Sequence, residues 1–78
     1  PQKTPGADLD GAAKEFYDGV SLFSQEKYKE ALGVFKRIAE GQGGGEYVQK
    51  AFYEMGRCLF MLQQYEVAIK HFTQLVQT

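Results

Sequence analysis

One pattern occurs twice in this chain, at a spacing of 37 residues. When residues 19–38 are compared with the residues 37 positions later, six meet an identical residue and two meet a similar apolar one. The identical pairs are Gly19/Gly56, Leu22/Leu59, Phe23/Phe60, Tyr28/Tyr65, Ala31/Ala68 and Phe35/Phe72, and the similar pairs are Leu32/Ile69 and Ile38/Leu75. Such a period is typical of proteins that stack copies of one small unit, because each unit buries its apolar face against the next. We therefore expect two copies of one unit.

Apolar residues recur with the period of a helix along most of the chain, and no stretch alternates as a half-buried strand does. Asp10 is the expected N-cap of the first helix, because its carboxylate can accept hydrogen bonds from free amides. The first and third connections contain neither Gly nor Pro, which predicts tight turns. The glycines at 41–45 are expected to end the second helix in the left-handed conformation. The predicted helices are Asp10–Ser24, Lys27–Glu40, Glu46–Leu62 and Gln64–Gln77.

The expected organisation is a linker, two units and a glycine-rich loop between them. Small repeated residues are expected to let helices approach closely, and large ones to fill the space between helices. The small residues are Gly19, Gly56, Ala31 and Ala68, and the large ones are Tyr28, Tyr65, Phe35 and Phe72. A solvated face is predicted for Lys27, Lys29, Glu30, Lys36, Arg37, Glu66 and Lys70. The corresponding ranges are 1–9 for the linker, 10–40 for the first unit, 41–45 for the loop and 46–78 for the second unit.

The repeated pattern resembles the tetratricopeptide repeat, a helix–turn–helix unit of 34 residues. The second unit carries the family's large aromatic, its Leu-Gly-like pair and its later Tyr, Ala and aromatic positions, at Phe52, Met55-Gly56, Leu59, Tyr65, Ala68, Phe72 and Leu75. The first unit departs from the pattern, because Glu15 and Asp18 stand at apolar positions. A polar start is what a terminal repeat shows. The resemblance implies an all-α fold, with four antiparallel helices in a short right-handed solenoid.

A finer resemblance concerns the bacterial envelope proteins of this family, namely the Tol–Pal coordinator and the outer-membrane assembly lipoproteins. The segments 17–23, 27–32 and 46–56 resemble the first repeat and the inter-repeat entry of those proteins. This resemblance implies a periplasmic or cell-envelope location, and without it the expected location is cytoplasmic.

The glycine-rich run at 41–45 raises the alternative of a phosphate-binding loop. Such a loop ends in Gly-Lys-Ser/Thr, whereas Gly45 is followed by Glu46, which would repel a phosphate. The single histidine, His71, has no clustered Cys or His partner, and is expected to be partly exposed. Cys58 is expected to be a small buried apolar residue. We therefore expect no catalytic, cofactor-binding or metal-binding residues, and no enzymatic activity.

The resemblance implies that the first helix of each unit lines a concave groove. Because this surface is apolar and aromatic with cations at its edge, it suits an amphipathic helix or an extended apolar peptide. The open alternative is that some of these residues pack against a neighbouring repeat or a second chain. The expected groove residues are Phe16, Val20, Phe23, Lys50, Tyr53, Arg57, Phe60 and Met61.

The expected partner is therefore a protein or peptide. A net charge of −1 argues against nucleic acid, which usually requires a basic face. No apolar run approaches the ~20 residues that span a bilayer. The last helix carries an apolar face that self-association could cover, with helix exchange about the glycine loop as one route. The alternative functions are a homo-oligomerisation or scaffold segment and a regulatory appendage of an enzyme. The apolar face comprises Ile69, Phe72, Leu75 and Val76.

Overall fold

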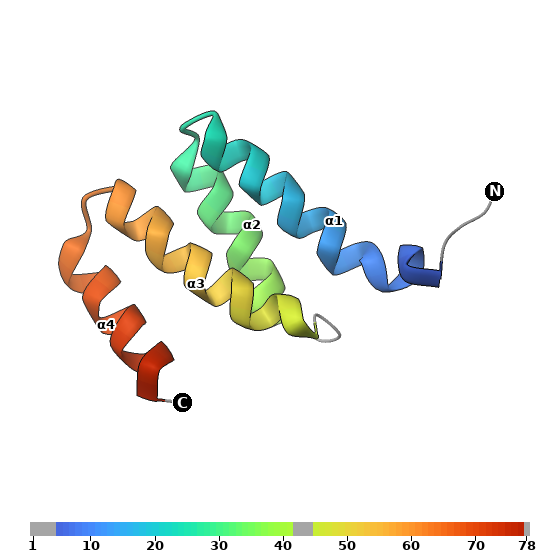
Figure 1. Cartoon of the computed structure of the whole chain (residues 1–78). Coiled ribbons are helices and arrows are strands. Elements are labelled where there is room, and N and C mark those ends of the chain that lie inside the picture. The colour runs from blue at the N-terminus through green and yellow to red at the C-terminus, as the bar shows by residue number, and fades with distance from the viewer. Residues whose placement is uncertain (1–4, 42–44, 78) are drawn as a thin grey trace.

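The computed structural model describes the chain at residues 5–41 and 45–77. This part of the chain folds into four helices and contains no strand, which confirms the all-α prediction (Figure 1). The helices are α1 (Pro5–Ser24), α2 (Tyr28–Glu40), α3 (Glu46–Met61) and α4 (Tyr65–Gln77).

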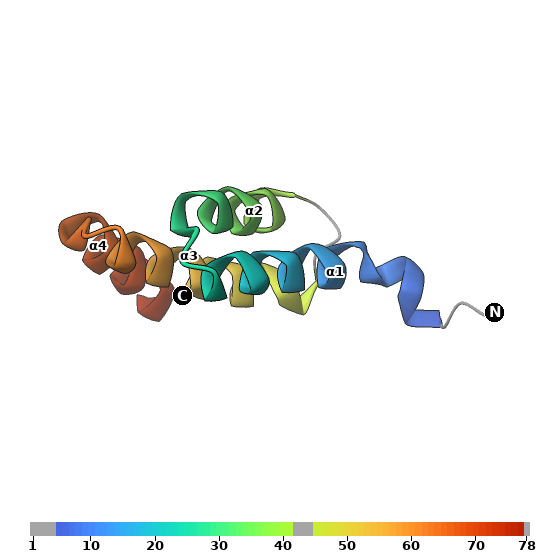
Figure 2. The ribbon, with the colours of Figure 1, turned by 90° about the horizontal axis from the view of Figure 1, so that it is seen from above.

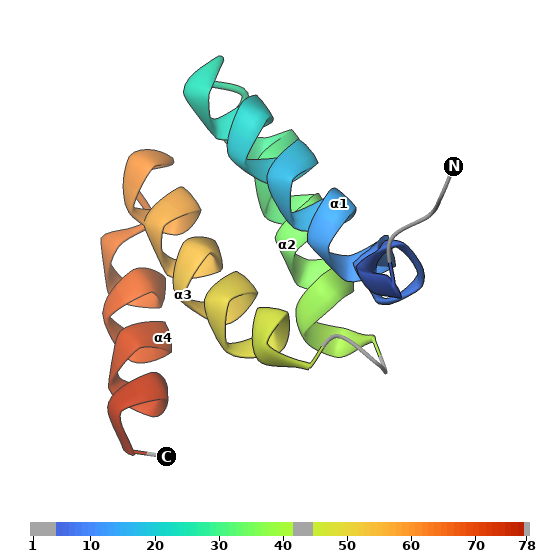
Figure 3. The same ribbon diagram turned by 45° about the vertical axis from the view of Figure 1, so that its right-hand side comes forward.

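The helices form two consecutive antiparallel pairs, α1 with α2 and α3 with α4 (Figure 1). Helix α3 lies between α4 and the first pair (Figure 3). Seen from above, α2 lies on one side of α1 and α3 (Figure 2). Among the described residues α2 packs on both α1 and α3, whereas α4 packs on α3 alone. Among the described residues, the side of α4 equivalent to the side of α2 that packs on α3 is therefore open.

Helix α1 begins at Pro5 rather than at Asp10. Proline is favoured at the first position of a helix, because its missing amide would have no intrahelical partner there. Asp10 lies inside the helix, so the prediction that it caps the helix was wrong.

Tight turns join the helices within each pair, as predicted, and the two turns are built alike. Glu26 and Gln63, which are equivalent in the repeat, both have a positive φ, of 64° and 66°. The amide of Lys27 donates to the carbonyl of Leu22 at 2.9 Å, and that of Glu26 to Phe23 at 2.9 Å. These two bonds form a Schellman motif, which satisfies the free carbonyls at the end of α1. The second turn repeats both bonds at the end of α3, through Gln64 to Leu59 and Gln63 to Phe60.

The connection between the pairs differs from its prediction. Helix α2 ends at Glu40, and Gly41 is extended, with φ −83° and ψ 171°. The left-handed region is instead occupied by Gly45, at the start of α3, with φ 56°. The amide of Gly41 satisfies the carbonyls of Arg37 and Ile38 without a left-handed residue. The other glycines of this loop lie outside the described residues.

The repeated glycines allow two helix–helix approaches, as predicted. A Cβ on Gly19 would lie 2.7 Å from Phe35 Cε1, and one on Gly56 would lie 2.5 Å from Phe72 Cζ. Both distances are too short for a real side chain, so each phenylalanine ring packs directly on backbone. The main core lies within the first pair and α3, and comprises Phe16, Ala31, Val34, Phe35, Ile38, Ala51 and Cys58.

Candidate functional site

The structure places three of the predicted groove residues, Phe16, Val20 and Phe23, in or against the core. Phe16 is only 8% exposed and belongs to the core. Its ring lies 5.4 Å from the ring of Phe35 and 5.4 Å from the ring of Tyr47, measured between centroids. Val20 is partly buried against the same core. Phe16 is therefore unavailable to a ligand, and its assignment to the groove was wrong because α3 supplies an aromatic ring that covers it.

Phe23 is also partly buried, and a cation covers its ring. The Arg57 guanidinium carbon lies 4.6 Å from the ring centroid, which is within the range of a cation–π interaction. Arg57 also donates to the Glu54 carboxylate at 3.0 Å. Tyr28 packs on Phe23 with an edge-to-face geometry at 5.0 Å. This arrangement joins α1 to α3 and leaves Arg57 itself exposed.

The remaining predicted groove residues are exposed on one side of α3. Tyr53, Phe60 and Met61 expose 50%, 54% and 42% of their surface, and Lys50 is also exposed. At 100° per residue, these positions and Arg57 fall within an arc of roughly 100° around the helix. The surface is therefore a band of large apolar side chains with two cations.

Tyr47 is a site residue that the sequence reasoning missed. It covers Phe16 from α3 and lies under the Lys50 ammonium, which is 5.1 Å from its ring centroid. The position equivalent to Tyr47 in the first unit is Asp10, so the repeat comparison contained no signal for an aromatic there. The only available signal was the apolar helical period of α3.

A second exposed apolar surface lies on α4. Ile69 and Val76 are 64% and 84% exposed, while Phe72 and Leu75 are half-buried. Ile69, Phe72, Thr73 and Val76 line a shallow hollow of about 440 Å³ whose wall is almost entirely apolar. Exposed apolar area of this kind is unfavourable in water and commonly marks a contact surface.

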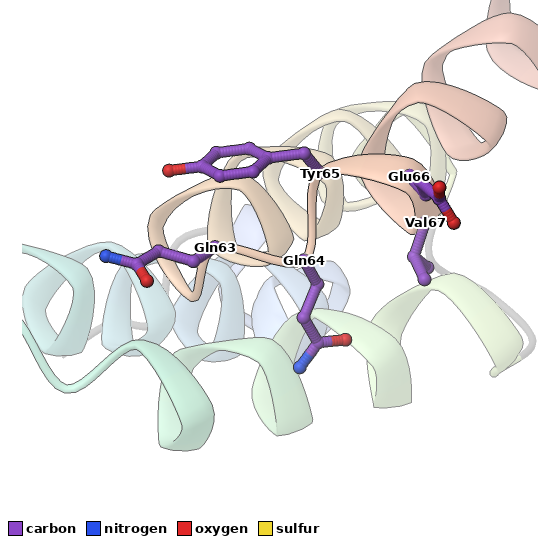
Figure 4. Close-up of a pocket in the computed structure, with 5 residues that line it drawn as sticks. All are labelled: Gln63, Gln64, Tyr65, Glu66 and Val67. Atoms are coloured by element: carbon purple, nitrogen blue, oxygen red, sulfur yellow. The ribbon is translucent and has the colours of Figure 1, made fainter.

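The turn between α3 and α4 carries another hollow, of about 390 Å³ (Figure 4). In Figure 4, Gln63 and Tyr65 both extend to the left from the turn, and Gln64 points downward. Neutral amides predominate here and the one ionisable acid is Glu66. The residues that line this hollow include no nucleophile with an adjacent base.

Cys58 and His71, whose side chains are chemically reactive, both pack inside the fold. Burial is the main cause that raises the pKa of Cys58 to about 11; the Glu54 charge adds to the shift and Arg57 opposes it. A thiol with a raised pKa is a poor nucleophile near neutral pH. His71 is half-buried, as predicted; its Nε2 donates to the Phe52 carbonyl oxygen, and its ring packs on that of Phe52.

Two further properties concern ions and membranes. The described residues contain no group of three or more His, Cys, Asp or Glu side chains able to hold a metal ion. Within the same part of the chain, each helix is too short or too polar to cross a bilayer.

Comparison with known proteins gives one match, which covers most of the second helical pair. No curated protein and no solved structure matched the chain. Residues 50–78 match the family model of the tetratricopeptide repeat, and they comprise most of α3 and all of α4. The match is to the repeat in general and does not support the finer resemblance to bacterial envelope proteins. With the four-helix fold, the match supports a tetratricopeptide-repeat protein, and repeats of this kind generally act as protein–protein interaction modules.

Proposed function

We propose that the exposed band on α3 binds a helix or extended peptide of a partner protein. The observation that carries this proposal is that Tyr53, Phe60 and Met61 remain exposed on the same side as Lys50 and Arg57. Aromatic and methionine side chains are enriched in interface cores, because they supply large contact area at a low entropic cost. The mechanism is presentation of a surface and involves no chemistry on the partner.

The two cations predict the chemistry of the partner. Arg57 is paired with Glu54, but the Arg57 side chain is 46% exposed, so the pair contributes at most about 1 kcal/mol. An incoming carboxylate can replace Glu54 at little cost, while Arg57 keeps its place over Phe23. Lys50 lies seven residues before Arg57 on α3, about two helical turns away, and can contact a second acid. We infer that the partner carries acidic residues beside apolar ones.

Selection from a peptide library displayed on phage tests this proposal. Peptides enriched on the wild-type chain are expected to combine acidic and apolar residues. They should bind Lys50→Glu and Met61→Ser at least ten-fold more weakly, because each change removes one half of the predicted recognition. Both residues are exposed, so neither change disturbs the core.

Ile69→Ser on α4 is the matched control for Met61→Ser, since it alters another exposed apolar residue on a different surface. If the enriched peptides bind both α3 variants as tightly as the wild type, or if only the α4 variant weakens binding, the band is not the binding site. The same surface would serve equally in a scaffold or in a regulatory segment of an enzyme.

A further inference from the structure

The charged residues in and beside the band on α3 have no charged counterparts in the first unit. Their equivalents on α1 are small, apolar or aromatic, so the repeat does not account for these charges. They are features of the second unit of this chain. The equivalent pairs are Lys50/Ala13, Glu54/Tyr17 and Arg57/Val20.

Glu54 occupies the guanidinium that the proposed binding site would offer to a partner. The Nη1 group of Arg57 donates to the Glu54 carboxylate at 3.0 Å. The side chain of Glu54 is only 16% exposed, whereas that of Arg57 is 46% exposed. A partner that brings an acid to Arg57 therefore meets a carboxylate that is already in place and partly withdrawn from water.

Arg57 does not depend on the charge of Glu54 for its position. Its guanidinium carbon lies 4.6 Å from the centroid of the Phe23 ring, so α1 holds it from a second side. A glutamine at position 54 could still accept the hydrogen bond through its amide oxygen. The charge of Glu54 therefore contributes something that a neutral acceptor would not, namely repulsion of a second carboxylate at the same guanidinium.

The spacing of the two cations indicates the kind of segment that can contact both. Lys50 and Arg57 lie seven residues apart on one side of α3, and their backbone positions are about 10.5 Å apart along its axis. In a partner helix, residues seven apart share one side and have the same separation. In an extended strand, residues on one side are roughly 6.6 or 13 Å apart, which does not match. The cations therefore suit a helix that runs along α3.

We propose that Glu54 is a resident competitor of the binding site. Its carboxylate occupies Arg57, and a partner helix with two carboxylates seven residues apart binds by placing one at Lys50 and the other at Arg57 in competition with Glu54. This inference rests on the proposed function of the band. Glu54 thereby determines specificity, because a lone acid on the surface of another protein gains little at an arginine that is already neutralised.

A defined peptide and one conservative substitution test the proposal. The probe is a fluorescent helical peptide with two glutamates seven residues apart and leucines between them on the same side. Glu54→Gln should bind this probe about five-fold more tightly, which corresponds to about 1 kcal/mol at 1.4 kcal/mol per factor of ten. Glu30→Gln is the matched control, because it removes the same charge from an exposed residue of α2, which contributes nothing to the band. It should leave the affinity unchanged within about two-fold.

Two variants of the probe separate competition from other effects. A probe with glutamine in place of both glutamates should bind Glu54→Gln and the wild type equally, because it brings no carboxylate to Arg57. A probe with its second glutamate moved by two positions carries that acid about 200° around the helix. It should bind the wild type at least about five-fold more weakly than the original probe.

The sign of the effect decides between two roles of Glu54. Weaker binding of the acidic probe to Glu54→Gln would mean that Glu54 holds Arg57 in place for the partner, and would overturn the proposal. An equal gain for the neutral probe, or equal binding of the probe with the moved glutamate, would also overturn it.

The proposed function can fail separately. If Lys50→Glu and Met61→Ser leave binding of the acidic probe unchanged, the band is not the binding site. If both changes weaken binding but Glu54→Gln has no effect, the band binds the helix and only the competition by Glu54 is wrong.

Discussion

The ring of Phe72 lies directly on the backbone of Gly56, at a distance that leaves no room for a Cβ. Phe35 lies on Gly19 in the same way, one repeat earlier. The two contacts set the separation of the helices in each pair. They differ in one respect, because Phe35 is fully buried and Phe72 is half-buried.

Alanine at either glycine is expected to destabilise the chain. Gly19→Ala should lower the free energy of unfolding by about 1–3 kcal/mol, because it overpacks a core in which Phe35 cannot move. Gly56→Ala should cost less, since Phe72 can shift toward solvent. Gly33 has open space around it in α2, so Gly33→Ala should raise the free energy of unfolding by about 1 kcal/mol. Urea unfolding measures all three.

Glycine at the left-handed turn residues is expected to stabilise the chain. Glu26 and Gln63 have a left-handed conformation that costs a residue with a Cβ about 1–2 kcal/mol. Glycine avoids this cost, but it loses about 0.5–1 kcal/mol more backbone entropy on folding, so the net effect is a small stabilisation. Glu26→Gly should therefore raise the midpoint of thermal unfolding. Lys36→Gly, at an exposed position inside α2, should lower it; a fall in both variants would contradict the Schellman geometry.

The buried thiol predicts a loss of stability at alkaline pH. Folding raises the pKa of Cys58 from 9.0 to about 11, so the folded chain holds the proton more tightly than the unfolded chain. The resulting stability is complete below pH 9 and is lost as the pH rises to 11, by about 2–3 kcal/mol. The free energy of unfolding of the wild type should therefore fall more over this range than that of Cys58→Ala. If the free energies of unfolding of the two proteins fall in parallel with pH, folding does not raise the pKa of the Cys58 thiol.

Phe16 and Tyr53 are equivalent in the repeat but are expected to differ in their effect on stability. Phe16→Ala should lower the free energy of unfolding by about 3–5 kcal/mol, because it empties a site closed by Phe35 and Tyr47. Tyr53→Ala should cost about 1 kcal/mol or less, because half of the side chain is in water. Equal losses in chemical denaturation would mean that Tyr53 is covered in solution.

The helical units and their internal contacts followed from the amino-acid pattern. The helical period and the repeated Gly…Phe spacing can be read from a short stretch of sequence. Two helices joined by a tight turn must pack on each other, and the small glycine opposite the large phenylalanine marks where they approach closely. The pairs Gly19 with Phe35 and Gly56 with Phe72 could therefore be predicted to pack closely. The first residue of α1 and the left-handed turn residues could not be predicted in this way. Proline also occurs outside helices, and glutamate has no preference for the positive φ that Glu26 adopts.

The tertiary structure decided which of the repeated residues belong to the core and which remain as surface. Phe16 and Tyr53 have the same place in the repeat, yet one is buried and the other exposed, because only Phe16 has α3 and Tyr47 beside it. Arg57 likewise covers Phe23 and not Phe60. The sequence by itself determined the unit and the contacts within it. Burial between units depends on which helix lies next to a given face, and that neighbour is a property of the assembled helices.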